Sequence, residues 1–506
     1  MTTVEPLPAG NRRTRLVITP DELPGQAATW LSNGYRVALV AGHHDAGDRL
    51  RAVYLFTAAD PDRRVELHVP LDRAAPHVPS LAGLSFTAGR FEREMHDLYG
   101  IVPDHHPLPR RLVRHFHWPA GWHPMLTDAG DPPEFGDVDG PYPFRTVEGP
   151  GVYEIPVGPV HAGLIEPGHF RFSVVGETIL NLKARLWFVH KGIEKLFAGR
   201  NPRQAIELAE RISGDTAIGH TLAFCRAVED ATGLHVPDST HRVRAVLLEL
   251  ERCYNHITDI GALCNDVGHG ILNTHAHRVR ERLLRINDTI TGHRLLRGAL
   301  HPGGAHVRCL PDPGELTAIG TDIAEIVALA LGHSTVRDRF TGTAILTREQ
   351  ATDLGTLGYV ARASGLSTDA RHDHPLPGVR FPRTAHSHTG GDVLARFLVR
   401  AEEIATSIAF ITTTVERLDG YRGTTPTTVA SAPGQPRSGV GLIEGWRGTI
   451  VHRVELDADG TLTRVKIVDP SFVNWPALPV ALADTIVPDF PLTNKSFNLS
   501  YAGNDL

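Results

Sequence analysis

Residues 241–264 read HRVRAVLLELERCYNHITDIGALC, and this stretch decides the fold. Apolar residues recur in it at intervals of three and four, which is the spacing of one face of an α-helix. So long a run predicts a long helix that buries one side. We expect this helix to belong to a mainly helical region from about 180 to 300.

Further patterns on either side complete a large second domain. Helical spacing returns at about 313–333 and 390–418, whereas GTIVHRVELDADGTLTRVKIVD (448–469) alternates apolar and polar residues about a DADG turn. Alternation around such a turn predicts a β-hairpin. Strand-like runs, YEIPVGPV and HFRFSVVG, precede the helices. The domain should therefore be mainly helical, with peripheral β-hairpins.

The first part of the chain has a different pattern. Between about 14 and 102, short β-like runs alternate with one amphipathic helical segment near 20–34, which indicates a small α/β domain. Residues 125–150 concentrate Gly, Pro and Asp and favour an extended, solvated connection. We therefore expect an α+β protein with an N-terminal domain at 1–124, a linker at 125–150 and a second domain at 151–506.

Composition narrows the class of protein. The chain has 506 residues, of which 41% are hydrophobic and 21% charged, as in ordinary globular proteins. The net charge is −6, and the basic residues are dispersed, so a nucleic-acid partner is not expected. No apolar stretch reaches the length of a membrane-spanning helix, and the N-terminus lacks the apolar core of a signal peptide. We expect a cytoplasmic protein that can still dock onto a membrane complex.

The four cysteines do not form a metal site by themselves. Cys225, Cys253, Cys264 and Cys309 lie far apart, and no two are in a C-x-x-C pair. Zinc sites and iron–sulfur clusters need such closely spaced thiolates. We expect all four to be buried free thiols.

A dense charged motif, FEREMHDLYGI, occupies residues 91–101. From the residues alone, its Arg and acids either pair at an interface or form a capped, solvated helix end. With HPLPRRLV at 106–113, it resembles the E-R-E-x-x-D-L-x-G-I signature of the small soluble subunit of the complex I connecting arm. The seven matching positions are Glu92, Arg93, Glu94, Asp97, Leu98, Gly100 and Ile101.

The rest of the chain resembles the neighbouring subunit. Five stretches carry the likeness: GPVHAGLIEPGHFRF, VHKGIEKLFAGRNPRQA, VRAVLLELERCYNH, RASGLSTDARHDHP and DPSFVNWPAL. Together they resemble the large subunit of formate hydrogenlyase-type membrane-bound nickel–iron hydrogenases. They resemble somewhat less closely the large connecting-arm subunit of complex I. Fusion of the two modules in one chain is itself a feature of the formate hydrogenlyase subunit.

The metal ligands of that family are missing here. The resemblance places Ser213 and Thr216 of RISGDTAIGH on the early cysteine pair, and Ser500 and Gly503 of SFNLSYAGNDL on the late pair. A nickel–iron centre needs soft, anionic sulfur, whereas hydroxyls are hard donors that ionise at far higher pH and glycine offers no donor. We therefore expect no nickel–iron centre and no other metal bound by this chain.

A second metal site of that family also lacks one of its ligands here. The resemblance implies that Glu194 matches a magnesium-binding glutamate whose histidine partner corresponds to Leu506. We expect Glu194 to be a helix-surface acid or a buried, paired one. The sequence ends where active hydrogenases often carry a removable tail, so no maturation by clipping is expected.

Acid–base groups remain around the vacated pocket. Glu166 corresponds to the glutamate of a hydrogenase element that resembles a proton gate, and His169, Asp215 and His220 should lie around the same cavity. Buried carboxylates and imidazoles can relay protons. The alternative is structural, with Glu166 paired to a basic neighbour such as Arg171 and His220 bonded to a backbone group.

Two further charged groups are ambiguous. Arg362 lies in a loop similar to one near the former metal pocket, and it is a cavity candidate unless Arg–Asp pairs simply hold that loop. Glu249, Arg252 and His256 share one side of the long helix. The resemblance implies an internal path toward a membrane arm, but a plain buried ion-pair network is an equal alternative.

The resemblance implies a peripheral-arm subunit of a complex I-like or formate hydrogenlyase-like complex. Its partners would be a small iron–sulfur subunit, which supplies electrons, and membrane-arm subunits at the cytoplasmic face. In complex I a His and a Tyr contact the quinone, but Pro167 and Gly214 occupy those positions here. The acceptor is therefore a quinone or another small molecule. The alternative is a non-catalytic scaffold, and an active hydrogenase is not expected.

Overall fold

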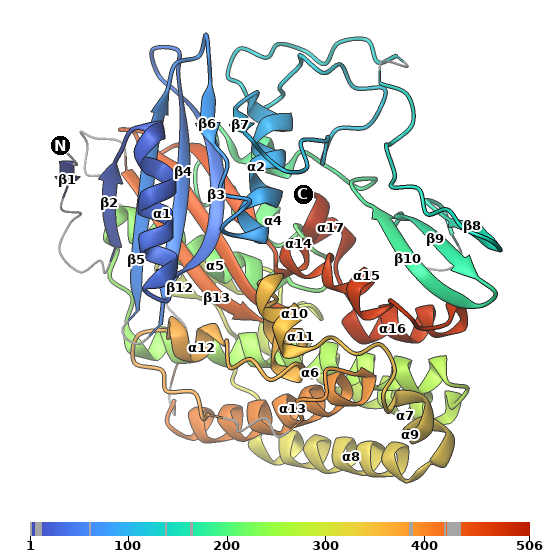
Figure 1. The fold of residues 1–506 in the computed structure, drawn as a ribbon. Coiled ribbons are helices and arrows are strands. Elements are labelled where there is room, and N and C mark those ends of the chain that lie inside the picture. Colours follow the sequence, from blue (N-terminus) through green and yellow to red (C-terminus); the bar gives the residue numbers. More distant parts are fainter. Residues whose placement is uncertain are drawn as a thin grey trace. The chain divides into compact units, whose positions relative to one another are not determined.

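The computed structural model describes residues 3–5, 13–59, 62–136, 139–161, 165–383, 388–418, 421 and 437–506. The chain forms two compact units, of which the first comprises Met1–Thr146 and the second Val147–Asn504 with Leu506. Helices and several small sheets make up the fold in Figure 1, so the predicted α+β class is confirmed.

The first unit is built on a five-stranded sheet with the order β1-β2-β5-β4-β3. β2 and β5 are parallel, and the other pairs are antiparallel. The strands and helix predicted within 14–102 are confirmed. The elements are β1 (Thr3–Glu5), β2 (Arg13–Val17), a 3-10 turn (Pro20–Glu22), α1 (Leu23–Ser32), β3 (Arg36–Asp45), β4 (Arg49–Ala58), β5 (Arg63–Leu71), β6 (His77–Pro79), α2 (Phe86–Tyr99) and β7 (Val102–Asp104).

The charged motif of α2 holds the first unit together. The Glu92 carboxylate accepts hydrogen bonds from the Ser80 hydroxyl at 2.6 Å and the Leu81 backbone N–H at 2.7 Å. Arg93 donates to the carbonyl oxygens of residues 110 and 111. Asp97 accepts from the backbone N–H groups of residues 112, 113 and 114. The motif is buried within this unit rather than forming a solvated helix end, so its charges tie two loops to α2.

The second unit contains two antiparallel three-stranded sheets, with the orders β10-β9-β8 and β13-β14-β15. The hairpin predicted at 448–469 is confirmed as β14 and β15. The prediction of helix from about 180 was wrong, because residues 178–185 alternate buried and exposed side chains and pair with β9. The strands are β8 (Val152–Val157), β9 (His169–Val175), β10 (Thr178–Arg185), β11 (Leu300–His301), β12 (Gly304–Ala305), β13 (Arg437–Gly445), β14 (Gly448–Leu456) and β15 (Leu462–Val468).

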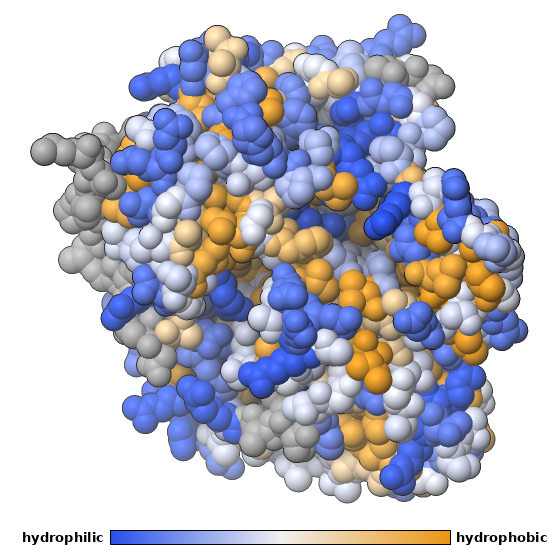
Figure 2. All heavy atoms as spheres, in the orientation of Figure 1, coloured by the Kyte–Doolittle hydropathy of each residue, from blue (hydrophilic) through white to orange (hydrophobic). Residues whose placement is uncertain are grey.

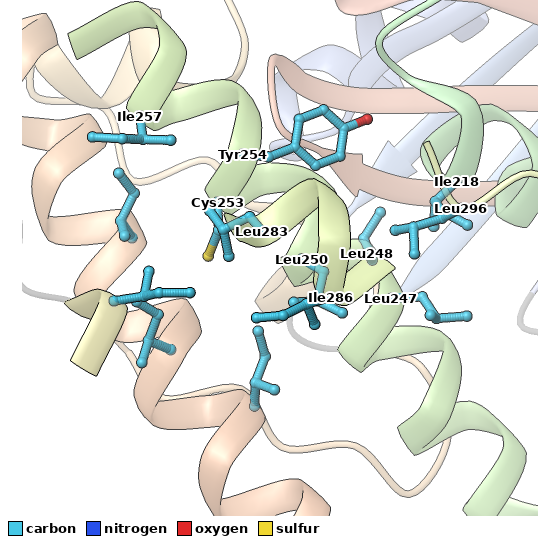
Figure 3. Close-up of a cluster of buried hydrophobic side chains, with 14 of the residues drawn as sticks. Ile218, Leu247, Leu248, Leu250, Cys253, Tyr254, Ile257, Leu283, Ile286 and Leu296 are labelled. Carbon is cyan, nitrogen blue, oxygen red and sulfur yellow. The ribbon is translucent and has the colours of Figure 1, made fainter. Parts of the chain in front are cut away.

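Helices contribute far more residues to the second unit than strands do, as predicted. The stretch 241–264 lies inside α6, whose apolar face packs with α7 and α13 in the buried cluster of Figure 3. The longer helices are α5 (Ala217–Thr232), α6 (Asp238–Asp266), α7 (Gly270–Thr291), α8 (Pro313–Gly332), α13 (Val393–Glu416) and α16 (Phe490–Phe497). The shorter ones are α3 (Ile193–Phe197), α4 (Ile206–Ala209), α9 (Ser334–Phe340), α10 (Arg348–Asp353), α11 (Gly358–Ala363), α12 (Ala370–Asp373), α14 (Pro470–Asn474), α15 (Ala477–Ala481) and α17 (Tyr501–Asp505).

Three of the four cysteines are buried free thiols, as expected, but Cys309 is exposed. Cys309 lies between β12 and α8 on the surface, outside any helix or strand. Burial raises the pKa of the Cys264 thiol to about 12. The buried cysteines therefore act as small apolar side chains.

No single helix in the described ranges is long and apolar enough to cross a membrane. α8 and α9, which meet at a bend of 83°, reach the required length and composition only as a pair. In this structure α8 buries Leu316, Ile319 and Ile323 in the same core as α6.

Two glycines bring α5 directly onto β13. A Cβ atom on Gly441 would lie 2.0 Å from the carbonyl oxygen of Ala223, and one on Gly439 would lie 2.0 Å from that of Ala227. Both contacts are with helix backbone, which cannot rotate away. This close approach fixes the middle of α5 against the sheet.

We expect Gly441→Ala to lower the free energy of unfolding by about 2 kcal/mol, because the added methyl group must push α5 off β13. Chemical denaturation of the purified chain measures this change. Gly25→Ala in α1 is the matched control, since a Cβ there has no atom within 4 Å. That control should gain about 0.5–1 kcal/mol. Equal stability of Gly441→Ala and the wild type would contradict the close approach.

Candidate functional site

The vacated ligand positions meet at the start of α5 and the start of α17. Ser213 Oγ lies 2.8 Å from Ser500 Oγ, although the two residues are 287 positions apart in the chain. Ser500 caps α17 by accepting the Gly503 backbone N–H at 2.9 Å. Thr216 lies at the N-cap position of α5. The two ends of the expected pocket are therefore brought together, and their hydroxyls bond directly to each other.

Asp215 links these hydroxyls to an arginine. Its Oδ1 accepts from Ser213 Oγ at 3.0 Å and from Thr216 Oγ1 at 2.9 Å. Arg447, in the turn between β13 and β14, donates two hydrogen bonds of 2.7 Å to the two carboxylate oxygens. Burial alone would raise the pKa of Asp215, but the charge and hydrogen bonds of Arg447 hold it down, at about 2. Asp215 therefore remains ionised, and its side chain keeps 40% of its surface exposed.

The loop that carries Asp215 is held by hydrogen bonds from α6 and from the turn that follows β13. Trp446 Nε1 donates to Thr216 Oγ1 at 3.1 Å, and Asn255 Nδ2 donates to the Asp215 carbonyl oxygen at 2.8 Å. The Glu251 carboxylate accepts the first two free N–H groups of α5, from Ile218 and Gly219. Burial outweighs these donors and raises the pKa of Glu251 to about 8. An acid that titrates near neutral pH thus lies directly beneath the vacated site.

A chain of two histidines and one acid lies beside the hydroxyls. His220 Nε2 is 3.0 Å from Asp469 Oδ2, and His220 Nδ1 is 3.0 Å from His452 Nε2. All three side chains are buried. Burial and then the neighbouring His220 keep the pKa of His452 well below its usual range, so His452 is neutral. Such a chain can hold or move a proton between its nitrogen and oxygen atoms.

Asp469 also fills the place of the last vacated ligand. A Cβ atom on Gly503 would lie 2.5 Å from the Asp469 carboxylate carbon and 2.5 Å from Oδ2. Burial would raise the pKa of Asp469, but the hydrogen bond and charge of His220 lower it. Asp469 Oδ1 further accepts the Ser471 backbone N–H at 2.7 Å. A carboxylate therefore occupies the space that a side chain at 503 would need.

Glu166 and His169 come from the connection between β8 and β9. Glu166 is exposed, and its Oε2 accepts the Ala502 backbone N–H at 3.0 Å, in the first turn of α17. His169 is half-buried, with Nδ1 3.0 Å from the Gly158 carbonyl oxygen. The structure shows Arg171 paired with Glu154 at 3.5 Å. Glu166 thus lies at the edge of the site, bonded to a residue two positions from Ser500.

The residues present do not fit a nickel–iron centre. Three of the four donor positions offer hydroxyl oxygen, which is a hard ligand, and the fourth has no side chain. The Ser213 to Ser500 hydrogen bond leaves no room for an ion between the two oxygens. No step of chemistry is assigned to such a centre here.

Glu194 does not fit a magnesium site either. Its carboxylate contacts Arg464 at 2.8 Å and Lys466 at 3.2 Å, and it accepts the Ile467 backbone N–H at 2.8 Å. Burial opposes ionisation, but the two cations outweigh it and lower the pKa of Glu194. Two side-chain cations already neutralise the charge that magnesium would need, which matches the buried, paired alternative.

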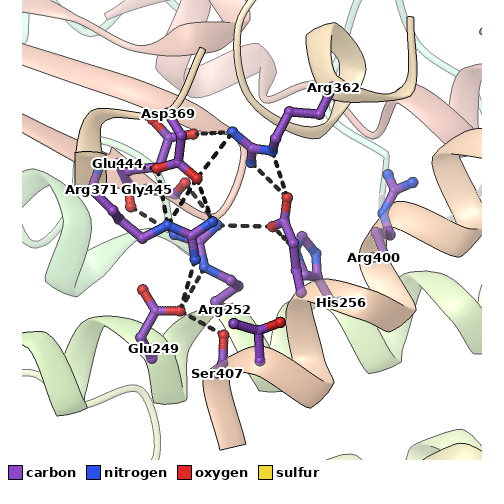
Figure 4. Close-up of polar contacts among 12 residues, drawn as sticks. Glu249, Arg252, His256, Arg362, Asp369, Arg371, Arg400, Ser407, Glu444 and Gly445 are labelled. Carbon is purple, nitrogen blue, oxygen red and sulfur yellow. Dashed lines mark hydrogen bonds and ion pairs between the residues drawn. The ribbon is translucent and has the colours of Figure 1, made fainter. Parts of the chain in front are cut away.

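Arg362 contacts none of the site residues described above, and its 3.6 Å contact with Asp369 matches the alternative of a loop held by Arg–Asp pairs. Its guanidinium donates to Glu403 Oε1 and Glu444 Oε1, each at 2.8 Å, in the buried ionic cluster of Figure 4. That cluster also includes Glu249, Arg252 and His256, the three residues that share one side of α6. The resemblance of its loop made Arg362 a cavity candidate, but α11 directs the side chain toward α13 and β13.

Several residues of the site were missed by the sequence reasoning. They are Glu251, Trp446, Arg447, His452 and Asp469. Four of the five lie on or next to the β13–β15 sheet, more than two hundred positions beyond Ser213. Two of the five stood in stretches that carried the resemblance, Glu251 in VRAVLLELERCYNH and Asp469 in DPSFVNWPAL, but neither was singled out as a site residue. No spacing signal marks the other three.

Comparisons with known protein families find a match for the N-terminal part of the chain and for much of the rest of it. The model of the 30 kDa subunit of respiratory-chain NADH dehydrogenase matches residues 16–132, and that of the 49 kDa subunit matches 266–436. The nickel-dependent hydrogenase family matches 191–264. These are two subunits of one complex and the hydrogenase to which the larger one is similar.

Individual proteins give the same result. Formate hydrogenlyase subunit 5 of Escherichia coli is 32% identical over 90% of this chain and 82% of its own length. The C/D fusion protein of the NADH-quinone oxidoreductase of Bacteroides thetaiotaomicron is 29% identical over 75% and 77%. A chain of the membrane-bound sulfane sulfur reductase, an archaeal respiratory membrane complex, shares the fold, with a TM-score of 0.63 and 23% identity over 70% of this chain and 99% of that one. The chain therefore belongs to the family of formate hydrogenlyase subunit 5 and the C/D fusion proteins of NADH-quinone oxidoreductase.

Proposed function

We propose that this chain is the peripheral-arm large subunit of a membrane-associated, complex I-like oxidoreductase, in which the vacated metal site handles protons instead of hydrogen. Electrons would arrive from iron–sulfur clusters on a small partner subunit. The acceptor would be a quinone or another small molecule, and the complex would lie at the cytoplasmic face of the membrane. Membrane-arm subunits complete the set of partners.

One observation carries this proposal. Three of the four positions of the lost thiolates lie next to an ionisable group, with Asp215 beside Ser213 and Thr216, and Asp469 in the space next to Gly503. His220 and His452 extend the second group, and Glu251 lies beneath the first. A merely degenerate pocket would be expected to fill with apolar side chains, because unpaired buried charges are costly. This one is filled with acids and imidazoles.

An apolar surface on the second unit supports a partner. Figure 2 shows hydrophobic residues gathered over the β8–β10 sheet, at the right of the view. Exposed apolar patches of this kind mark contacts with proteins or membranes. The large exposed side chains on or next to these strands are Tyr153, Val160, Ile165, Val175, Leu180 and Ile486.

A scaffold without chemistry is the second candidate, and one contact favours it. Ser213 and Ser500 join the two ends of the second unit by a direct 2.8 Å hydrogen bond, so the space between them holds no substrate. In that case the polar groups only clamp α17 to α5. The two candidates differ in what happens when the acid at the edge of the site is neutralised.

We expect Glu166→Gln to lower acceptor reduction by the purified complex by about a hundredfold, the size of effect that a positioned acid or base contributes. Tagging this chain and purifying its complex gives both the neighbours and the material for a quinone-reductase assay. Glu154→Gln, which removes an exposed acid of β8, the strand that precedes the Glu166 connection, is the matched control and should leave the rate unchanged.

Two results would count against the proposal. Recovery of the chain without any iron–sulfur or membrane subunit would remove it from such a complex. An intact complex with an unchanged Glu166→Gln rate would favour the scaffold.

A further inference from the structure

A small cavity borders the buried ionic cluster, and none of the residues that line it is one of the site residues described above. It has a volume of about 30 Å³, and three of its lining residues are the charged groups Glu249, Arg371 and Glu444. The rest of its wall is mainly apolar. Its outer side is formed by Leu376 and Phe381, which are half-buried next to exposed residues. A cavity of this size holds one or two water molecules.

Glu249 presents an oxygen that no other side chain satisfies. Its Oε2 accepts from Ser407 Oγ at 2.6 Å, Arg252 Nε at 2.9 Å and Arg371 Nη1 at 3.2 Å. Within the described residues, no donor meets Oε1, and in Figure 4 dashed lines reach only the other oxygen of this carboxylate. A buried carboxylate oxygen without a donor is costly unless water reaches it. The cavity that Glu249 lines supplies the place for that water.

The cluster next to the cavity carries more acids than bases. Four carboxylates from α6, α13, β13 and the start of α12 face three guanidiniums from α6, α11 and α12, all in mutual contact. They are Glu249, Glu403, Glu444 and Asp369 against Arg252, Arg362 and Arg371. His256 adds no charge, since burial lowers its pKa to about 4. One added proton would balance the cluster.

A second acid of the cluster lines the same cavity. Glu444 accepts from Arg362, the Ala370 backbone N–H and the Thr449 hydroxyl. Burial, and then the nearby charge of Asp369, raise the pKa of Glu444. The added proton therefore has two acceptors in reach of the same water.

We propose that this cavity is a water-filled port through which the buried cluster exchanges one proton with solvent, with Glu249 Oε1 as the receiving atom. A hydronium ion in the cavity gives its proton to Oε1 and leaves as water, and the reverse step returns the proton. The port does not depend on the vacated site. Its use in proton coupling rests on the proposed function.

One contact holds the side of the cavity that is nearest to solvent. Arg371 lies over the Phe381 ring at 4.1 Å from the ring centre, while its own guanidinium is paired with Asp369 and Glu249. His374 and Val379 complete this side. Motion of Phe381 off Arg371 would widen the path to solvent without breaking an ion pair.

The test uses the complex purified through a tag on this chain. A high-resolution cryo-EM map should show ordered water within about 2.6–3.2 Å of Glu249 Oε1. Ala245→Val fills the cavity from α6 and should remove that density. Ala262→Val, on the same helix and half-exposed, carries the same cost in helix propensity and should keep it. A dry cavity in the wild-type map would overturn the proposal, whether or not the variants fold.

Infrared spectroscopy tests the exchange itself. The carboxylic C=O band that appears on acidification, and is missing in Glu249→Gln, should shift on transfer to D2O. We expect Ala245→Val to slow that shift by about a hundredfold, because the carrier water is lost. Equal exchange in Ala245→Val and wild type would overturn the port even if water is present. These readouts do not involve Glu166, so the port and the proposed function can fail separately.

Discussion

Glu403→Gln is expected to lower the free energy of unfolding by about 3–5 kcal/mol, the cost of leaving buried charges without their partner. Glu403 contacts Arg362 at 2.7 Å, Arg252 at 3.2 Å and His256 at 2.9 Å. None of these side chains can turn to solvent, because each is at most 1% exposed. A neutral amide would therefore leave two guanidiniums underpaired in the core.

The neighbouring acid provides the control. Glu402 is on the same turn of α13, but it keeps 26% of its side-chain surface exposed and pairs with His388. Glu402→Gln should change the free energy of unfolding by less than about 1 kcal/mol. Denaturant titration of the two variants measures both values. If the two losses were equal, the cluster would not be a buried unit that depends on Glu403.

A pH dependence of stability is the second large effect. His241 is buried at the start of α6, and burial, followed by the charges of Arg226 and Arg244, lowers its pKa to about 3. In the unfolded chain the pKa returns to about 6.5. Between these values only the unfolded chain binds the proton, so stability falls as the pH falls. One such group contributes up to about 1.4 kcal/mol per pH unit.

His241→Gln should remove that contribution. Relative to the wild type, we expect the variant to gain about 3 kcal/mol as the pH is lowered from 6.5 to 4. His275→Gln, at an exposed position of α7, is the control and should follow the wild-type curve. Denaturant titrations at a series of pH values test this. Parallel curves for His241→Gln and wild type would show that His241 is not held neutral.

The sequence predicted those elements whose periodicity is strong and local. α6 and the β14–β15 hairpin follow from patterns that any neighbouring structure would preserve. β10 was missed because its alternation is short and adjoins a long helical region, so the pairing with β9 decided its structure. The exposure of Cys309 depends on where its loop lies, which no local pattern encodes.

The residues of the site divide in the same way, into those that a local pattern predicts and those that only the packing of the fold brings in. Ser213, Thr216 and Ser500 were found because ligand spacing survives the loss of the ligands. Arg447 and His452 were not, because they reach the site only when the β13–β15 sheet packs on α5. For Arg362 the sequence left two alternatives open, since a familiar loop does not determine which way its helix directs a side chain.

The carboxylate beside Gly503 is an obstacle to a thiolate at that position. Serine and threonine differ from cysteine by little volume, so three of the four positions could revert one at a time. A cysteine at 503 would collide with Asp469, and Asp469 cannot withdraw without stranding His220. Reversion would need at least two coordinated changes, with a destabilised intermediate between them.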